Sequence, residues 1–506
     1  LPVTRHQGRS YQDWMLRTPV RLGGFGLRSM EDISLPAFMG AVEQSLPHFL
    51  GEEGIFPQLA TTLLEVGEGP IRWRGLLESG RRTGEELRNL WTTLQEEARQ
   101  MTNYLGTELQ GPLSFPVEGA GDRSCDGSTR RKVTSWLEDA RAGTLRKGLE
   151  DHEDQTARPV WAYPQLDKLS QGWILSLPGP GGLNQAEFAE TVARHLCLPS
   201  PSCAPRVGEP LGERNLTIDP YGDNILSVSN IPGGAFTARH DLVKGTINSL
   251  ILDSGVRADC EVYGAFRDLI PVEALTEEEE LQTGRGRQGL LPDFRLDLPG
   301  PGAGTGPVAL GNVVSTLAEL KVIGAVKTYY PRAGPRARAK KGVEVRGDRI
   351  PGEYRRPLAA LDTRYHGVEE GQTGPLVRRL EGHGRLLTWV MGAWQEGSKD
   401  IHALLDLLAE AKVRSLGLAR GREATEWERA MILSCYRRTL STTAARASSG
   451  SLLGRLAKVG GGHRAAARRR AWAKREGERL EEERRAHWRA HIQGRGVMRG
   501  EFVYPV

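Results

Sequence analysis

Apolar residues recur at helical spacing in several separate stretches of the chain. In 237–253, Val243, Ile247, Leu250 and Ile251 fall on one face, which predicts an amphipathic helix packed on a core, with Thr237 as its cap. Asn184 precedes a second helical stretch, 184–196, and Asn is a favoured capping residue. The same pattern predicts further helices at 33–46, 84–104, 375–380, 400–413 and 423–443.

Four other stretches have the pattern of β-strands. Residues 256–266 have an extended character, 290–298 alternate between apolar and polar side chains, and 317–326 are almost continuously apolar. Residues 387–394 form a further candidate strand. The order helix, strand, strand, strand predicts a small mixed α/β core with its sheet flanked by helices.

The length of 506 residues predicts two or three folded units. We divide the chain into a mostly helical region at 1–112, a connector at 113–180 with a short helix near 132–149, an α/β domain at 181–447, and a basic tail at 448–506 that is helix-prone or disordered. A start at Leu1 suggests a piece of a longer protein. No membrane span or signal peptide is recognisable, which favours a soluble, intracellular protein without a membrane partner.

Positive charge is clustered, although the formal net charge is only +5. Clustered cations attract a polyanion because each neutralised phosphate releases counterions, and solvated loops with a solvated tail are the alternative explanation. The clusters are Arg130-Arg131-Lys132, then Arg336, Arg338, Lys340 and Lys341, then Arg468-Arg469-Arg470 with Lys474 and Arg475. The five unevenly spaced Cys argue against a disulfide framework.

Two acidic residues and a lysine form the candidate catalytic set. Asp293 follows a proline at a strand, and Glu319 and Lys321 are two apart in the next strand, so their side chains project to the same face. Mg²⁺, or Mn²⁺ in its place, needs only one or two carboxylates plus water and a phosphate oxygen. Glu261 is either a third acidic ligand or a surface residue, and Glu319 with Lys321 could instead form a solvated surface pair.

An aromatic pair lies just past the predicted catalytic strand. Tyr329 and Tyr330 follow Lys327 and precede the cations 336–341. Such an arrangement favours base stacking or phosphate contact, with edge-strand packing as the alternative. We therefore assign Lys327, Tyr329, Tyr330, Arg336, Arg338, Lys340 and Lys341 to a nucleic-acid-binding surface.

The order of four motifs resembles a known nuclease region. The motifs are Ile218-Asp219-Pro220-Tyr221-Gly222-Asp223, Ala238-Arg239-His240-Asp241, Leu291-Pro292-Asp293-Phe294 and Ala318-Glu319-Leu320-Lys321. They resemble the restriction-like endonuclease region, of the PD-(D/E)XK superfamily, at the C-terminus of certain non-LTR retrotransposon polyproteins. Residues 395–402 and 437–441 look like later parts of such proteins, and 21–29 are similar to the segment that follows the reverse transcriptase core.

This resemblance implies a PD-(D/E)XK-type sheet and a metal-dependent endonuclease that nicks target DNA to prime reverse transcription. It assigns Asp293, Glu319 and Lys321 as the catalytic set, with Arg239 and His240 facing DNA or bracing the site. Genomic DNA as the target implies a nuclear location, otherwise a cytoplasmic one, and element RNA is a further candidate partner. The alternatives are an inactive nucleic-acid-binding remnant and, for His240, an ordinary first-turn position beside Asp241.

The chain departs from the family pattern at its zinc knuckle. Asn224 stands where a His is expected and Val228 where a Cys is expected, which leaves Cys197 and Cys203. Two thiols do not supply the four ligands of a structural zinc site, so zinc is not expected. The chain has no polymerase signature of an aromatic residue and Ala before paired Asp, so no polymerase activity is expected.

Overall fold

The computed structural model describes residues 11–22, 24–27, 138–139, 142–143, 145–175, 182–211, 216–228, 235–262, 265–270, 292–299, 313–331, 340–420 and 425–459. The predicted helices 33–46 and 84–104, the clusters at 130–132 and 468–475, and the tail from 460 lie outside these residues. The chain forms two compact units, Leu1–Gln155 and Thr156–Val506.

The first unit contains a short buried helix within its described part. Helix α1 (Tyr11–Arg17) buries Tyr11, Trp14 and Met15, and a 3-10 turn (Val20–Leu22) follows. Residues 145–150 are also helical, at the end of the helix predicted near 132–149.

A four-stranded mixed sheet forms the centre of the second unit. Its order is β1 (Ala258–Cys260), β2 (Phe294–Pro299), β3 (Val313–Val322) and β4 (Leu387–Met391). The first two pairings are antiparallel and β3 pairs with β4 in parallel. The prediction of a mixed α/β core is therefore confirmed. The strand predicted at 256–266 is much shorter, because the chain leaves the extended conformation at Glu261, where φ is 53°.

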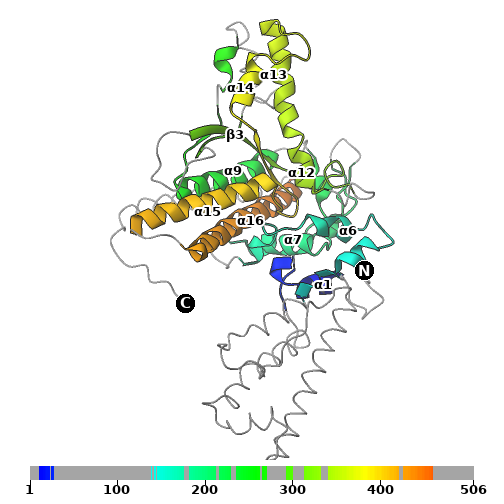
Figure 1. Cartoon of the computed structure of the whole chain (residues 1–506). Coiled ribbons are helices and arrows are strands. Elements are labelled where there is room, and N and C mark those ends of the chain that lie inside the picture. The colour runs from blue at the N-terminus through cyan, green and yellow to red at the C-terminus, as the bar shows by residue number, and fades with distance from the viewer. Residues whose placement is uncertain are drawn as a thin grey trace, which may run out of the picture. The chain divides into compact units, whose positions relative to one another are not determined.

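Three long helices pack together against this sheet (Figure 1). They are α9 (Ala235–Ser254), α15 (Lys399–Arg420) and α16 (Glu426–Leu456). The predicted apolar face of α9 is buried in the shared core with Phe294, Leu320 and Trp389. Because α9 begins at Ala235, Thr237 lies in its first turn and is not its cap.

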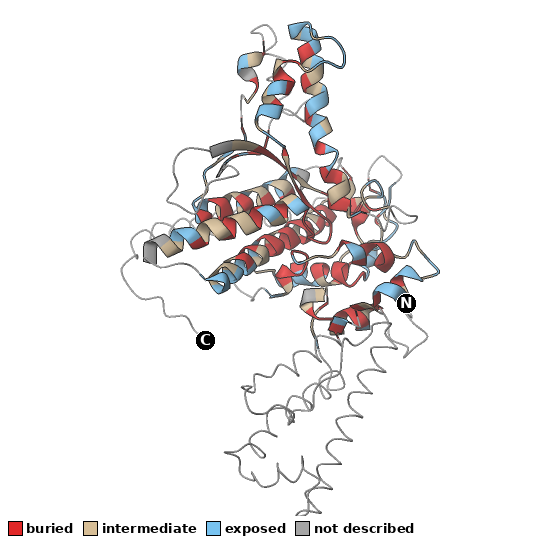
Figure 2. Cartoon of the chain, viewed as in Figure 1, coloured by how far each residue is buried: buried red, intermediate tan, exposed pale blue. Residues whose placement is uncertain are grey.

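The parallel pair β3 and β4 is joined by a helical crossover, as a parallel connection requires. Its helices are α12 (Gly342–Gly347), α13 (Ile350–His366) and α14 (Pro375–Gly382). Figure 1 shows α13 and α14 beyond the sheet, on the side away from α9, α15 and α16. Figure 2 shows exposed positions along most of α13, whereas most positions in the C-terminal half of α16 are buried.

Short helices and 3-10 turns complete the second unit. They are α6 (Arg158–Ala162), the 3-10 turns Tyr163–Gln165, Gly172–Leu175, Ala204–Arg206 and Arg267–Leu269, α7 (Gln185–His195) and α8 (Asp223–Ser227). The expected cap of α7 is confirmed, since Asn184 and Glu187 form a reciprocal capping box. No helix of the described residues is long and apolar enough to cross a membrane.

Two predicted boundaries need correction. Residues 158–175, placed in the connector, pack in the second unit, where the Trp173 N–H donates to Ser441 Oγ at 2.9 Å. The helix predicted to end at 443 continues to Leu456, past the start of the predicted tail. The Ala, Ser and Thr residues of this helix end have small side chains, which let neighbouring backbones approach closely. At Gly172 the approach is so close that an added Cβ atom would lie 2.8 Å from the Cβ atom of Ser441.

Candidate active site

Three carboxylates lie in one row of neighbouring chain segments, with Glu261 just after β1, Asp293 just before β2 and Glu319 within β3. Phe294 pairs with Cys260 on β1 and with Ala318 on β3. One residue further along each strand, Glu261, Asp293 and Glu319 occupy the next row, where the Glu261 N–H donates to the Asp293 carbonyl at 2.8 Å. Glu319 is paired in turn with Thr388 on β4. The sheet register therefore brings together acidic residues that are far apart in sequence.

The Asp293 carboxylate is bound from both the sheet and α9. Its Oδ2 accepts the Leu320 N–H at 3.0 Å, and its Oδ1 accepts the Lys244 ammonium at 2.7 Å. His240 Nε2 lies 3.4 Å from Oδ2 and 3.3 Å from the Leu320 carbonyl oxygen. His240 and Lys244 are one helical turn apart on α9, so both reach the same end of β2.

These partners keep Asp293 ionised. Burial by itself would raise its pKa, but the hydrogen bonds and charges of His240 and Lys244 outweigh burial and lower the pKa to about 2. Burial also lowers the pKa of His240, yet the Asp293 carboxylate outweighs this effect and raises it. The pKa of Lys244 is raised in the same balance, against its own burial.

Glu319 has the opposite electrostatic environment. Burial raises its pKa, and the nearby negative charge of Asp293 adds to this, against the opposing effect of Lys321 and Tyr354. Tyr354 on α13 donates to Glu319 Oε2 at 2.5 Å, and the Lys321 ammonium contacts Oε1. The side chain of Lys321 keeps 26% of its surface exposed. The site thus holds one ionised carboxylate beside a second whose proton affinity is increased.

The donor set fits a hard divalent cation. Two buried carboxylates on adjacent strands repel one another in a medium of low dielectric constant, and a cation relieves that repulsion. Asp293 and the Leu320 carbonyl, both hard oxygens, converge beside His240. No three His, Cys, Asp or Glu side chains of the described residues form a metal site. A metal here would use two carboxylates with backbone oxygen, water and phosphate, as Mg²⁺ commonly does.

Lys244 and Tyr354 were not predicted from the sequence. Lys244 lies one turn after His240 on the predicted helix, so helical spacing alone could have found it. Tyr354 lies in the crossover between β3 and β4, and no local pattern links it to Glu319.

Arg239 braces the fold and does not face solvent. The residue is buried, and its guanidinium donates to the Val322 carbonyl at the end of β3 at 3.1 Å. Burial, with the charges of Arg455 and Arg194, lowers its pKa to about 10. Of the two roles expected for Arg239, bracing is the one that its burial supports.

The predicted nucleic-acid-binding residues divide into several environments. Lys327 is exposed, whereas Tyr329 is half-buried with the Arg349 guanidinium 5.5 Å from its ring centroid. Lys340 pairs with Asp348, and the Lys341 ammonium lies 3.3 Å from Asp167. Arg336 and Arg338 lie outside the described residues.

The structure corrects the assignment of Tyr330. Its ring is buried against Trp161 and Trp394, so it has no exposed face on which a base could stack. Its hydroxyl donates to Glu396 Oε1 at 2.5 Å. Burial raises the pKa of Glu396 to about 7, against the opposing effect of this hydrogen bond. Tyr330 is therefore part of the core behind β4.

Apolar packing and hydrogen bonds hold the segment whose sequence was compared with a zinc knuckle. Cys203 and Val228 lie in an apolar cluster with Leu452 of α16. Burial raises the pKa of the Cys203 thiol to about 11, which disfavours the thiolate that zinc requires. Asp219 accepts the N–H of Asn224 at 2.6 Å, so the turn is closed by hydrogen bonding.

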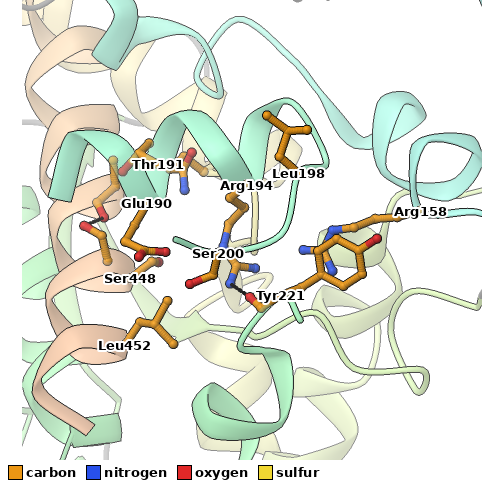
Figure 3. A pocket seen from close by; sticks show the side chains of 12 residues that line it. Arg158, Glu190, Thr191, Arg194, Leu198, Ser200, Tyr221, Ser448 and Leu452 are labelled. Carbon is orange, nitrogen blue, oxygen red and sulfur yellow. Dashed lines mark hydrogen bonds between the residues drawn. The ribbon is translucent and has the colours of Figure 1, made fainter. Parts of the chain in front are cut away.

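A polar hollow lies between α7 and α16 and is also lined by Arg158, Ser200 and Tyr221 (Figure 3). Arg158 and Arg194 share the buried Asp223 carboxylate at 2.5 and 3.0 Å, and the Arg158 guanidinium lies 4.2 Å from the Tyr221 ring centroid. Burial would raise the pKa of Asp223, but the two arginines outweigh it and lower the pKa. This ion network joins Arg158 of α6 to α7 and α8 within the second unit.

Comparison of the chain with protein-family models, with curated proteins and with solved structures finds no match in any of the three. The row of Glu261, Asp293 and Glu319, with the neighbouring Lys321, is therefore the basis for any functional assignment.

Proposed function

We propose that this chain is a metal-dependent endonuclease that hydrolyses phosphodiester bonds in DNA. One observation carries the proposal: Asp293 and Glu319 are buried in the same row of adjacent strands, with the partly exposed Lys321 two residues after Glu319. Burying two carboxylates so close together costs free energy that a structural role does not require. Binding of a divalent cation would offset this cost by neutralising the two carboxylates.

Asp293 and Glu319 would hold the ion between β2 and β3. When bound, the ion neutralises phosphate charge and lowers the pKa of a water molecule that attacks phosphorus. Asp293 is already ionised and presents oxygen without prior proton loss. Tyr354 fixes the Glu319 carboxylate through its hydroxyl, and Lys321, whose side chain reaches solvent, orients the water or stabilises the developing charge.

The finer assignment to a PD-(D/E)XK nuclease of a non-LTR retroelement rests on the four motifs. Asp293 directly precedes β2, β3 carries Glu319 and Lys321, and α9 carries Arg239 and His240. These elements follow one another in the order that this resemblance implies. We propose nicking of genomic target DNA, a nuclear location and element RNA as a second partner on the same basis.

Plasmid nicking tests the proposal directly. With Mg²⁺ or Mn²⁺ we expect conversion of supercoiled plasmid to the open circle, and none in EDTA. Asp293→Asn and Lys321→Ala should each lower the rate by about a hundredfold or more. The matched control is Asp297→Asn, since Asp297 is an exposed carboxylate on the same strand. Equal nicking by the wild type and both site variants would refute the proposal.

One observation favours a second candidate, an inactive nucleic-acid-binding remnant. Both carboxylates already have an ammonium partner from the chain itself, Lys244 for Asp293 and Lys321 for Glu319. A remnant would bind DNA with an affinity that falls steeply with salt, yet would show no metal-dependent cleavage. Fluorescence anisotropy across a salt series, run beside the nicking assay, separates the two candidates.

A further inference from the structure

Lys244 stands between two carboxylates of the row. Its ammonium lies 2.7 Å from Asp293 Oδ1 and 3.4 Å from Glu261 Oε1. The side chains of Lys244 and Asp293 are 12% and 11% exposed, whereas that of Glu261 is 51% exposed. The ammonium is thus shared between one buried and one solvated partner.

An ammonium and a metal ion bound to the Asp293 carboxylate compete with one another. Both are cations, and they would use the same carboxylate within a few ångströms in a medium of low dielectric constant. A metal that binds Asp293 therefore weakens the Lys244 ion pair, and an ammonium that leaves Asp293 needs another partner.

Glu261 is the acidic residue placed to receive the Lys244 ammonium. The Glu261 N–H is bonded to the Asp293 carbonyl at 2.8 Å, which fixes the two residues side by side. A left-handed backbone, φ 53°, turns the chain out of β1 at Glu261. The Lys244 side chain has a flexible four-carbon stem, so a small rotation moves its ammonium from Asp293 to Glu261. The ammonium keeps an acidic partner throughout.

We propose that Lys244 is an exchangeable counter-ion, which neutralises Asp293 in the metal-free protein and transfers to Glu261 when a divalent cation binds Asp293. This inference rests on the proposed metal site. It assigns Glu261 as a positioning residue for Lys244 and not as a third metal ligand.

Mn²⁺ binding measured by the EPR signal of the free ion tests the exchange without relying on cleavage. Lys244→Met should tighten binding by about tenfold or more, because a competing charge is removed. Lys244→Arg, which keeps the charge, should stay close to the wild type. Glu261→Gln should weaken binding severalfold, because the displaced ammonium loses its partner. Circular dichroism confirms that each variant is folded.

The double variant Lys244→Met with Glu261→Gln gives the decisive comparison. If Glu261 only receives the ammonium, its substitution has no effect once Lys244 is gone, so the two effects are not additive. If Glu261→Gln weakens Mn²⁺ binding equally in both backgrounds, Glu261 is a ligand and the exchange is refuted. Unchanged affinity in Lys244→Met also refutes it.

Asp293→Asn separates this inference from the proposed function. Mn²⁺ binding that depends on Asp293 but is not tightened by Lys244→Met contradicts the exchange and leaves the metal site standing. Mn²⁺ binding that is absent, or independent of Asp293, refutes the metal site and the exchange together.

Discussion

Tyr354 on α13 donates a 2.5 Å hydrogen bond to Glu319 on β3, so the crossover between the two parallel strands holds a carboxylate of the site. Tyr354→Phe keeps the buried ring and removes only the donor. We expect a loss of about 1–2 kcal/mol in the free energy of unfolding, with weaker Mn²⁺ binding because Glu319 is no longer fixed. Urea denaturation and Mn²⁺ titration measure both. Unchanged values for both would show that this hydrogen bond does not support the site.

The ionised state of Asp293 predicts a stability difference that depends on pH. Its pKa in the folded protein is about 2, below the ordinary value of 3.8, so its charged form stabilises the fold above pH 3.8. This contribution, about 2 kcal/mol, is lost as pH falls from 3.8 to about 2. The stability advantage of the wild type over Asp293→Asn should therefore shrink across that interval in urea unfolding, and a constant advantage would contradict the assignment.

Glu396 predicts the opposite pH dependence. Its pKa is raised from 4.5 to about 7 by burial, so the folded protein favours the protonated acid. Wild-type stability should then fall as pH rises from 4.5 towards 7, because the unfolded chain loses this proton first. Glu396→Gln cannot ionise and should lose this decline in thermal unfolding. Parallel curves for the two proteins would contradict the raised pKa.

Because Arg158 and Arg194 share the Asp223 carboxylate, we expect its substitution to lower the free energy of unfolding strongly. Asp223→Asn leaves the buried Arg158 and Arg194 without their counter-charge, which should cost about 3–5 kcal/mol of unfolding free energy. Glu209→Gln is the control, since Glu209 forms a partly exposed pair with Arg206 and its substitution should change stability much less. Equal effects of the two substitutions in urea denaturation would exclude a structural role for the network.

The C-terminal half of α16 predicts that the fold extends beyond 447. Leu452 is buried against α8, so Leu452→Ala should destabilise by about 2–5 kcal/mol. The neighbouring Leu453 is only partly buried, and Leu453→Ala should cost clearly less. Denaturation of both variants tests this, and equal small losses would place the segment outside the core.

The part of the site that follows from local pattern was predictable. Alternation along one strand placed Glu319 and Lys321 on one face, and helical spacing placed the buried face of α9. The row that includes Glu261 and Asp293 depends on strand register, which no single segment encodes. Tyr354 depends on how the crossover packs, and Tyr330 was misplaced because burial depends on partners such as Trp394, distant in sequence.

Composition misled where packing decided the outcome. The Ala and Ser residues that follow 443 lie past the predicted end of the helix, yet they continue it because their small side chains fit closely against neighbouring helices. Gly222 also packs closely against α16. Its φ is 72°, and a Cβ atom at this position would lie 2.5 Å from the side chain of Leu452, so the site favours glycine.

The continuity of α16 has a mechanical consequence. One helix of 31 residues, about 46 Å long, contributes Leu440 to the core beneath the sheet and Leu456 to the apolar cluster around α8. Unfolding of either cluster would expose buried residues of the same helix. The sheet that carries the acidic row and the apolar cluster around Cys203 and α8 are thereby linked through one helix, so we expect them to unfold together.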